Sequence, residues 1–240
     1  MGGSLPHGRA GPSTLKPLSQ ASAESFIQAN TALIAPPHVP EIELHLADEA
    51  HELWQRTEEE LEEIGLQPPF WAFAWAGGQG LARYVLDNPR TVAGKRVLDF
   101  AAGSGIVAIA AAKAGAEEVL AADIDPFCEA AVRLNAAKNG VTIGFTLENL
   151  VGHDNGWDVV LAGDVFYDQA FAALLIPWLT ALSERGADVL VGDPGRHYLP
   201  KFGLARLATY EVPVTRALED AEVKKTTVWR LSNHLHHSTA

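Results

Sequence analysis

Apolar residues recur in short, nearly continuous runs through the middle of the chain, and stretches with helical composition separate these runs. Such runs are typical of strands buried on both faces of a parallel sheet. They predict five strands, over residues 97–100, 119–124, 143–147, 158–165 and 188–192. Helices are predicted over the alanine-rich residues after Gly105 and over residues 126–139 and 171–184; Pro177 indicates that the last helix starts or bends there.

The two ends of the chain extend this pattern. Near the C-terminus, two strands joined by an acidic turn are predicted, over residues 209–215 and 225–231. Together with the five parallel strands they predict a seven-stranded sheet whose last strand runs antiparallel. Near the N-terminus, capping residues, alternation and helical spacing predict helices over 22–31, 48–64 and 80–86 and a strand over 41–47.

Composition and punctuation suggest four parts of the chain. Residues 1–21, rich in glycine, proline and serine, read as a flexible leader, and 22–90 as an extension that packs on the core. Residues 91–233 form the predicted ligand-binding core, and 234–240 a frayed tail. The three histidines of this tail could bind a metal, but terminal disorder is the favoured interpretation, so no metal site is predicted.

Charge and cysteine content exclude several classes of protein. The net charge is −12, whereas nucleic-acid binding normally requires a basic face, so no nucleic-acid partner is expected. A single cysteine excludes a disulfide framework, and no apolar run is long enough to span a membrane. A soluble cytoplasmic protein is therefore expected. Acids dominate residues 41–63, either as a solvated helix face or as a surface that attracts a basic partner.

A turn of small residues, DFAAGSG (residues 99–105), follows the first predicted strand of the core. Read from Gly103 it is G-x-G-x-x-A, the fingerprint of a dinucleotide site and of an NAD-linked oxidoreductase. Read from Asp99 it is D-x-A-x-G-x-G, which resembles motif I of the class I S-adenosylmethionine methyltransferases, with Ala101 at the usual first glycine and Gly103 and Gly105 at the next two. An acid within the turn suits a ligand that carries an ammonium group and would repel a pyrophosphate, which favours the second interpretation.

The next strand ends in an acid suited to a ribose. Asp123 follows Gly103 by 20 residues, close to the spacing at which a carboxylate accepts hydrogen bonds from the ribose hydroxyls. Asp164 lies at the end of the fourth core strand and Tyr167 just after it, in the sequence GDVFYD (residues 163–168). Ligands of doubly wound sheets bind beyond the strands' carboxyl ends, so these two side chains should meet the methyl acceptor. A full negative charge at Asp164 suits a lysine ammonium; the alternative is an acid that caps the next helix.

These motifs together resemble the seven-β-strand lysine methyltransferases known as methyltransferase family 16. DVFY (164–167) matches the family's D-x-x-Y motif, and PPFWAFAWAGGQGLARYVLDNP (68–89), GDVFYD and GDPGR (192–196) resemble its branch that methylates the electron transfer flavoprotein β subunit. Two departures are Ala76, where relatives often carry proline, and Ala101, where glycine is usual. The resemblance implies a Rossmann-like class I methyltransferase sheet with helices on both faces and an N-terminal extension.

The resemblance also implies roles for individual residues. It assigns catalysis to Asp164 and Tyr167. It assigns binding of S-adenosyl-L-methionine, and of the product S-adenosyl-L-homocysteine, to a second set: Trp75, Gly78, Asp99, Ala101, Gly103, Gly105, Asp123, Ile124, Asn149 and Gly163. The aromatic segment around Trp75 could equally be core packing, and Asp193 and Arg196 either line the substrate entrance or form a simple loop.

The expected activity is methylation of protein lysines on the electron transfer flavoprotein β subunit by a monomeric enzyme. Two other acceptors stay open, a ribosomal protein and a small amine. The remaining alternatives are the NAD-linked oxidoreductase and a cofactor-binding domain without catalysis.

Overall fold

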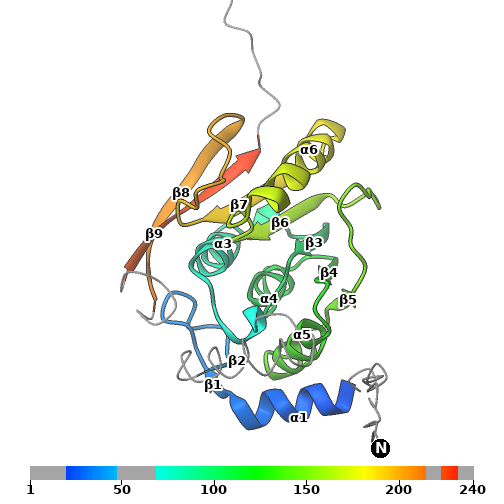
Figure 1. Ribbon diagram of the computed structural model, residues 1–240, viewed down its shortest axis with the longest axis vertical. Coiled ribbons are helices and arrows are strands. Elements are labelled where there is room, and N and C mark those ends of the chain that lie inside the picture. The colour runs from blue at the N-terminus through cyan, green and yellow to red at the C-terminus, as the bar shows by residue number, and fades with distance from the viewer. Residues whose placement is uncertain (1–19, 48–68, 215–222, 232–240) are drawn as a thin grey trace, which may run out of the picture.

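The computed structural model describes residues 20–47, 69–214 and 223–231 (Figure 1). Its centre is a seven-stranded sheet with the strand order β5-β4-β3-β6-β7-β9-β8. The strands are β3 (Arg96–Phe100), β4 (Glu118–Ala122), β5 (Gly144–Thr146), β6 (Val159–Gly163), β7 (Asp188–Asp193), β8 (Leu204–Pro213) and β9 (Val223–Leu231). Strands β3 to β7 pair in parallel, and β9 pairs antiparallel with both β7 and β8. The predicted α/β architecture with an antiparallel last strand is therefore confirmed.

Most predicted strands differ from the observed ones only at their ends. The strand predicted over 119–124 ends at Ala122, and the one predicted over 158–165 ends at Gly163, so that Asp123 and Asp164 lie just beyond the hydrogen-bonded ladder. The first C-terminal strand was predicted too short at its start: it begins at Leu204 rather than at residue 209. Its first five residues, LARLA, are partly or fully exposed because β8 is an edge strand, and they lack the alternation of apolar and polar positions that marks a strand in the sequence.

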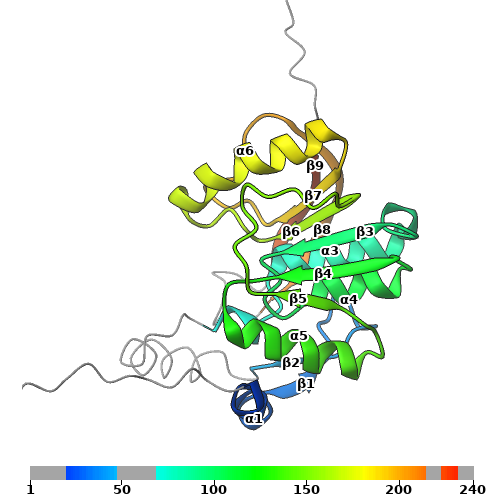
Figure 2. The same cartoon turned by 90° about the vertical axis from the view of Figure 1, so that its right-hand side faces the viewer.

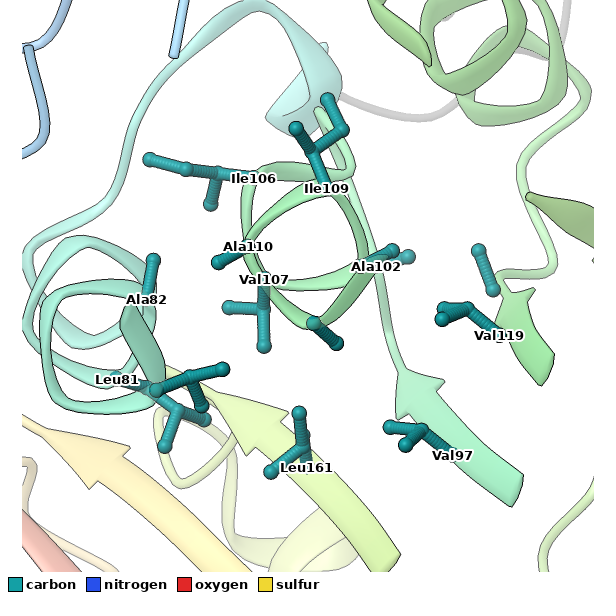
Figure 3. Close-up of a cluster of buried hydrophobic side chains, with 14 of the residues drawn as sticks. Leu81, Ala82, Val97, Ala102, Ile106, Val107, Ile109, Ala110, Val119 and Leu161 are labelled. Atoms are coloured by element: carbon teal, nitrogen blue, oxygen red, sulfur yellow. The ribbon is translucent and has the colours of Figure 1, made fainter. Parts of the chain in front are cut away.

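Helices cover both faces of the sheet (Figure 2). One face packs against α3 (Ala76–Asp87) and α4 (Ile106–Lys113), and the other against α6 (Gln169–Arg185). Figure 3 shows Ile106, Val107 and Ala110 of α4 on the side of Leu81 and Ala82 of α3. Alternate residues of each buried strand supply the two cores, as the period of two along a strand requires.

The N-terminal elements pack beside α5 (Pro126–Lys138), as Figures 1 and 2 show. Helix α1 (Gln20–Asn30) is joined to α5 by aromatic contacts, and Trp71 stacks on Phe127 with ring centroids 5.6 Å apart. Strand β1 (Ala32–Ile34), which the sequence did not indicate, pairs with β2 (Leu44–Leu46). Strand β2 is shorter than the strand predicted over 41–47 and lies within it. Strand β1 is mostly exposed, so no buried face marks it in the sequence.

Three helices begin earlier than predicted, of which α1 starts at Gln20 in place of residue 22. Helix α3 starts at Ala76, not at residue 80, because the glycines at 77 and 78 form its first turn instead of a loop. Ala76 is the first residue of this helix, a position where proline is also favoured, so alanine in place of the family's proline preserves the local structure. Helix α6 starts at Gln169, with Asp168 accepting a hydrogen bond from the amide of Phe171 as its cap, and it continues through Pro177.

Several predictions fall outside the described residues. These are the leader, the helix over 48–64 with most of the acidic run, the acidic turn between the last two strands and the C-terminal tail with its histidines. The division of the chain at residue 90 and the monomeric state stay predictions. No helix in the described part of the chain is long and apolar enough to cross a membrane.

Glycines allow helix α3 to approach the ends of β6 and β7 at backbone contact distance. A Cβ atom on Gly77 would lie 2.4 Å from the carbonyl oxygen of Gly192 and 2.7 Å from the amide nitrogen of Asp164. A Cβ atom on Gly163 would lie 2.8 Å from the Cα of Gly78. The atoms that these Cβ atoms would meet belong to the backbone and cannot rotate away, so this junction requires glycine.

We therefore expect Gly77→Ala to destabilise the fold by about 3 kcal/mol, the upper end of the usual cost of overpacking. Gly144→Ala is the matched control, because its Cβ would meet its nearest neighbour at an ordinary 3.5 Å and the free energy of unfolding should change by less than about 0.5 kcal/mol. Urea unfolding of both variants measures the difference. A Gly77→Ala protein as stable as the wild type would show that the junction adapts.

Candidate active site

The turn after β3 has the backbone geometry of a ligand-binding glycine turn. Ala101, Gly103 and Gly105 have φ angles of 56°, 52° and 79°, all in the left-handed region. For Ala101, which is not a glycine, this conformation costs about 1–2 kcal/mol, a strain of the kind found at functional sites. A Cβ atom on Gly103 would meet only the Phe70 carbonyl, at 3.7 Å, so the chain leaves room for a ligand along this backbone.

Asp123 and Ile124 lie beside this turn, beyond the end of β4. One carboxylate oxygen of Asp123 accepts from the amide of Gly103 at 3.0 Å, and the other accepts from the amide of Asp125 at 3.1 Å. A carboxylate has about four acceptor positions, and the Cys128 thiol also bonds to this side chain, so the acceptor capacity that remains is open to ligand hydroxyls. The side chain of Ile124 is 68% exposed, a large apolar surface next to that acid on which a base can stack.

Asp99 is more deeply buried than an open ligand-binding carboxylate. Its side chain is 1% exposed, and one oxygen accepts from the amide of Ala108 at 2.8 Å. Burial, together with the nearby charge of Asp123, raises its pKa well above the usual range. Asp99 thus fastens the first turn of α4 to β3, while contact with a ligand ammonium group stays a prediction.

The aromatic segment before α3 contains both core residues and partly exposed ones, and contact of Trp75 with the cofactor stays a prediction. Trp71 and Phe73 are buried core residues, whereas Phe70 and Trp75 stay partly exposed. The indole N–H of Trp75 donates to the carbonyl of Phe70 at 3.0 Å, which holds the ring at the start of α3. Because the same carbonyl faces Gly103, this segment lies over the glycine turn, with Gly78 one turn further along the helix.

Asp164 lies at the junction of β6, β7 and α3. It has a φ angle of 63° and is 8% exposed. One carboxylate oxygen accepts from the amide of Gly77 at 3.0 Å and the other from Nε of Arg196 at 2.5 Å. Asp164 thus joins the first turn of α3 to the loop that carries Arg196. The alternative in which Asp164 caps the next helix is wrong, because Asp168 does so.

Tyr167 stands at the surface beside Asp164. Its residue is 53% exposed, and its ring lies 5.9 Å from Phe70 and 6.1 Å from Phe171, measured between centroids. Partial desolvation first, and then the neighbouring Asp123, Asp168 and Asp164, raise the pKa of its hydroxyl. The group therefore stays a neutral phenol at physiological pH and can both donate and accept a hydrogen bond.

Asn149 lies in the loop after β5, where its side-chain oxygen accepts from the amide of Val151 at 3.1 Å. This contact uses one of the two acceptor positions of that oxygen, and a role of Asn149 in recognising a base stays a prediction. The site brings the other predicted residues together around the carboxyl ends of β3, β4 and β6 (Figure 1).

The loop after β7 contributes a residue that the sequence left undecided. Arg196 reaches back from this loop to the carboxylate of Asp164, while its own amide and that of Gly195 donate to one oxygen of Asp193, at 2.7 and 2.6 Å. Asp193 is 1% exposed. The motif GDPGR is thus more than a simple loop; the only sequence signal for this arrangement was an acid and an arginine at a strand end.

Comparison with known proteins agrees with this site. A sequence profile of the ribosomal protein L11 methyltransferase (PrmA) family matches residues 83–175. The chain is 40% identical over 218 residues to the electron transfer flavoprotein β subunit lysine methyltransferase of Xenopus laevis, covering 88% of this chain and 87% of that protein. It is 38% identical to the protein of the same name from Danio rerio, covering 88% and 84% of the two chains.

A solved structure of similar fold is magnesium protoporphyrin IX methyltransferase from Synechocystis with bound S-adenosylhomocysteine, with a TM-score of 0.50, 13% identity and coverage of 77% of this chain and 100% of that one. These relatives, together with the shared fold, identify a class I methyltransferase that uses S-adenosylmethionine, and they do not support the NAD-linked alternative. Within that class, the chain belongs to the electron transfer flavoprotein β subunit lysine methyltransferase family.

No cluster of three or more His, Cys, Asp or Glu that could hold a metal ion occurs in residues 20–47, 69–214 and 223–231.

Proposed function

We propose that this methyltransferase acts on lysine side chains of the electron transfer flavoprotein β subunit. Support for the partner comes from relatives that carry this substrate in their names and that align along most of both chains. The observation that carries the choice of lysine is the carboxylate of Asp164, which lies directly beyond β6 and next to an exposed tyrosine. Such a charge attracts an ammonium group better than a neutral acceptor would.

The residues around the glycine turn fit the cofactor. The backbone of Gly103 and Gly105 would run along its amino-acid part, the free acceptor positions of Asp123 would take its ribose hydroxyls, and Ile124 would cover its adenine. Asn149 and Trp75 lie at the two ends of this path in the proposal. S-adenosylmethionine supplies a methyl group activated by a sulfonium charge.

Because the cofactor supplies the activated methyl group, the residues of this chain are required mainly to bind and orient the lysine. At neutral pH only about one free lysine side chain in a thousand is uncharged and nucleophilic, since its pKa is about 10.4. Asp164 would bind the ammonium form and direct the nitrogen toward the methyl group. The aromatic faces of Phe70 and Tyr167 stabilise a cation there, and the Tyr167 hydroxyl can pass the released proton to water.

One observation favours a second class of methyl acceptor, a ribosomal protein. The profile that matches residues 83–175 is that of enzymes named for ribosomal protein L11. This region holds the cofactor turn together with Asp164 and Tyr167, but it contains neither Gly77 nor the loop with Arg196, so it omits part of the proposed lysine site.

The decisive test compares the two proteins as substrates. Purified electron transfer flavoprotein and ribosomal protein L11 are incubated with the enzyme and isotopically labelled S-adenosylmethionine, and intact-mass and peptide mass spectrometry locate the label. We expect label on lysines of the flavoprotein β subunit at a rate at least tenfold above that on L11. Label on L11 alone, or on neither protein, would refute the proposed substrate.

A further inference from the structure

Two buried acids lie next to each other at the ends of β6 and β7. Gly163 and Gly192 are register partners in the parallel ladder, and Asp164 and Asp193 follow them directly. Both acids are less than a tenth exposed, at 8% and 1%. The two side chains therefore belong to one cluster, which the loop carrying Arg196 closes from the outside.

Three of the four carboxylate oxygens in this cluster accept hydrogen bonds. Those of Asp164 accept from the amide of Gly77 and from Arg196, and one oxygen of Asp193 accepts from the amides of Gly195 and Arg196. The second oxygen of Asp193 is buried and has no hydrogen-bond partner among the described residues. A buried polar atom without a partner costs free energy, and it marks a site where a ligand is expected to complete the bonding.

The charges of the cluster point to the kind of ligand. Two carboxylates face one guanidinium, so with both acids ionised the three side chains carry one more negative charge than positive. An ammonium group brings one positive charge and three N–H donors, which match both the excess charge and the unpaired oxygen. The proposed substrate presents this group on lysine.

We propose that Asp193 is a second acceptor-binding residue, whose unpaired carboxylate oxygen receives the substrate ammonium group together with Asp164. This inference rests on the proposed lysine site and deepens it: the cation is held between two acids and not by Asp164 alone. Arg196 fills the rest of the cluster, so a substrate group without a positive charge leaves the oxygen of Asp193 unpaired and is discriminated against.

The electrostatics of Asp193 give the proposal a distinctive readout. Burial and the adjacent Asp164 raise its pKa to about 6, although the two amides and Arg196 act in the opposite direction. Below that pH the carboxyl group is protonated and attracts a cation poorly; above it the carboxylate is available. Binding of an ammonium group should therefore strengthen as the pH rises through about 6, while an alkylammonium itself stays charged.

The first test uses n-butylamine, which carries the end of a lysine side chain, with S-adenosylhomocysteine present. Nuclear magnetic resonance titrations of the full chain at pH 5 and pH 7.5 measure its dissociation constant, and n-butanol serves as the uncharged control. We expect at least fivefold tighter binding of the amine at pH 7.5 and no pH dependence in Asp193→Asn. Equal amine affinity in the wild type and Asp193→Asn at pH 7.5 would overturn the proposal. Because no protein substrate is used, this outcome is separate from failure of the proposed function.

The second test separates direct contact from an effect through Arg196. Asp193→Asn is measured alone and in an Arg196→Ala background, with the flavoprotein as substrate. We expect kcat/KM to fall at least tenfold in both backgrounds, mainly through KM, with unchanged affinity for S-adenosylhomocysteine. Loss of the effect once Arg196 is absent would mean that Asp193 only shapes the loop, and the proposal would fail. Asp188→Asn is the matched control, an acid at the opposite end of β7 that pairs with Arg230 at 2.7 Å.

Discussion

Replacing Asp164 by asparagine should reduce methylation of the protein substrate by on the order of 10²-fold or more, while the cofactor still binds. Asparagine keeps the size of the side chain and tolerates the left-handed backbone found at this position. The substitution removes the charge that would bind the lysine. It also directs the NH₂ group of asparagine toward either the Gly77 amide or Arg196, and because both of these donate to the carboxylate in the wild type, two donors then face each other. The reaction then loses a group that positions the nucleophile.

Steady-state methylation with the flavoprotein, together with calorimetric titration of S-adenosylhomocysteine, measures the two effects separately. Asp154→Asn is the control, since this acid also pairs with an arginine, Arg185, but lies in the loop before β6, away from the site. Tyr167→Phe should cost less than Asp164→Asn if the hydroxyl only relays a proton. An Asp164→Asn enzyme with the wild-type rate would reduce Asp164 to a structural residue and remove the main physical support for lysine.

Replacing Asp123 by alanine should weaken cofactor binding at least tenfold. Its carboxylate would accept two ribose hydrogen bonds, each contributing roughly 1.5–3 kcal/mol when one partner is charged. The same carboxylate already binds the amides of Gly103 and Asp125, so its loss also loosens the turn that the cofactor follows. Both effects act in the same direction.

Calorimetric titration of S-adenosylhomocysteine into Asp123→Ala measures this loss directly. Asp158→Ala is the matched control, because Asp158 also accepts from a backbone amide, that of Arg96, at the opposite end of the sheet. Its cofactor affinity should equal that of the wild type. If Asp123→Ala binds as tightly as the wild type, the ribose assignment is wrong.

The sequence by itself determined the sheet and the cofactor side of the site. Short apolar runs separated by helices identify a parallel sheet because both faces of such strands are buried, and this information is local. The glycine turn and Asp123 could be recognised for the same reason, since residues near in the chain build one strand-turn-helix unit and the acid expected to bind a ribose follows at a fixed spacing. The short exposed strand β1 has no buried face and escaped prediction.

Only the tertiary structure decided the surroundings of Asp164, the acid proposed to bind the methyl acceptor. Gly77, Asp164 and Arg196 are far apart in the sequence, and they meet because glycines let α3 touch the ends of β6 and β7. The same packing buries Asp193 beside Asp164 and leaves one of its oxygens without a partner among the described residues. Hydrogen bonding and burial at this junction depend on which strands become neighbours in the sheet, and no local pattern of residues contains that information.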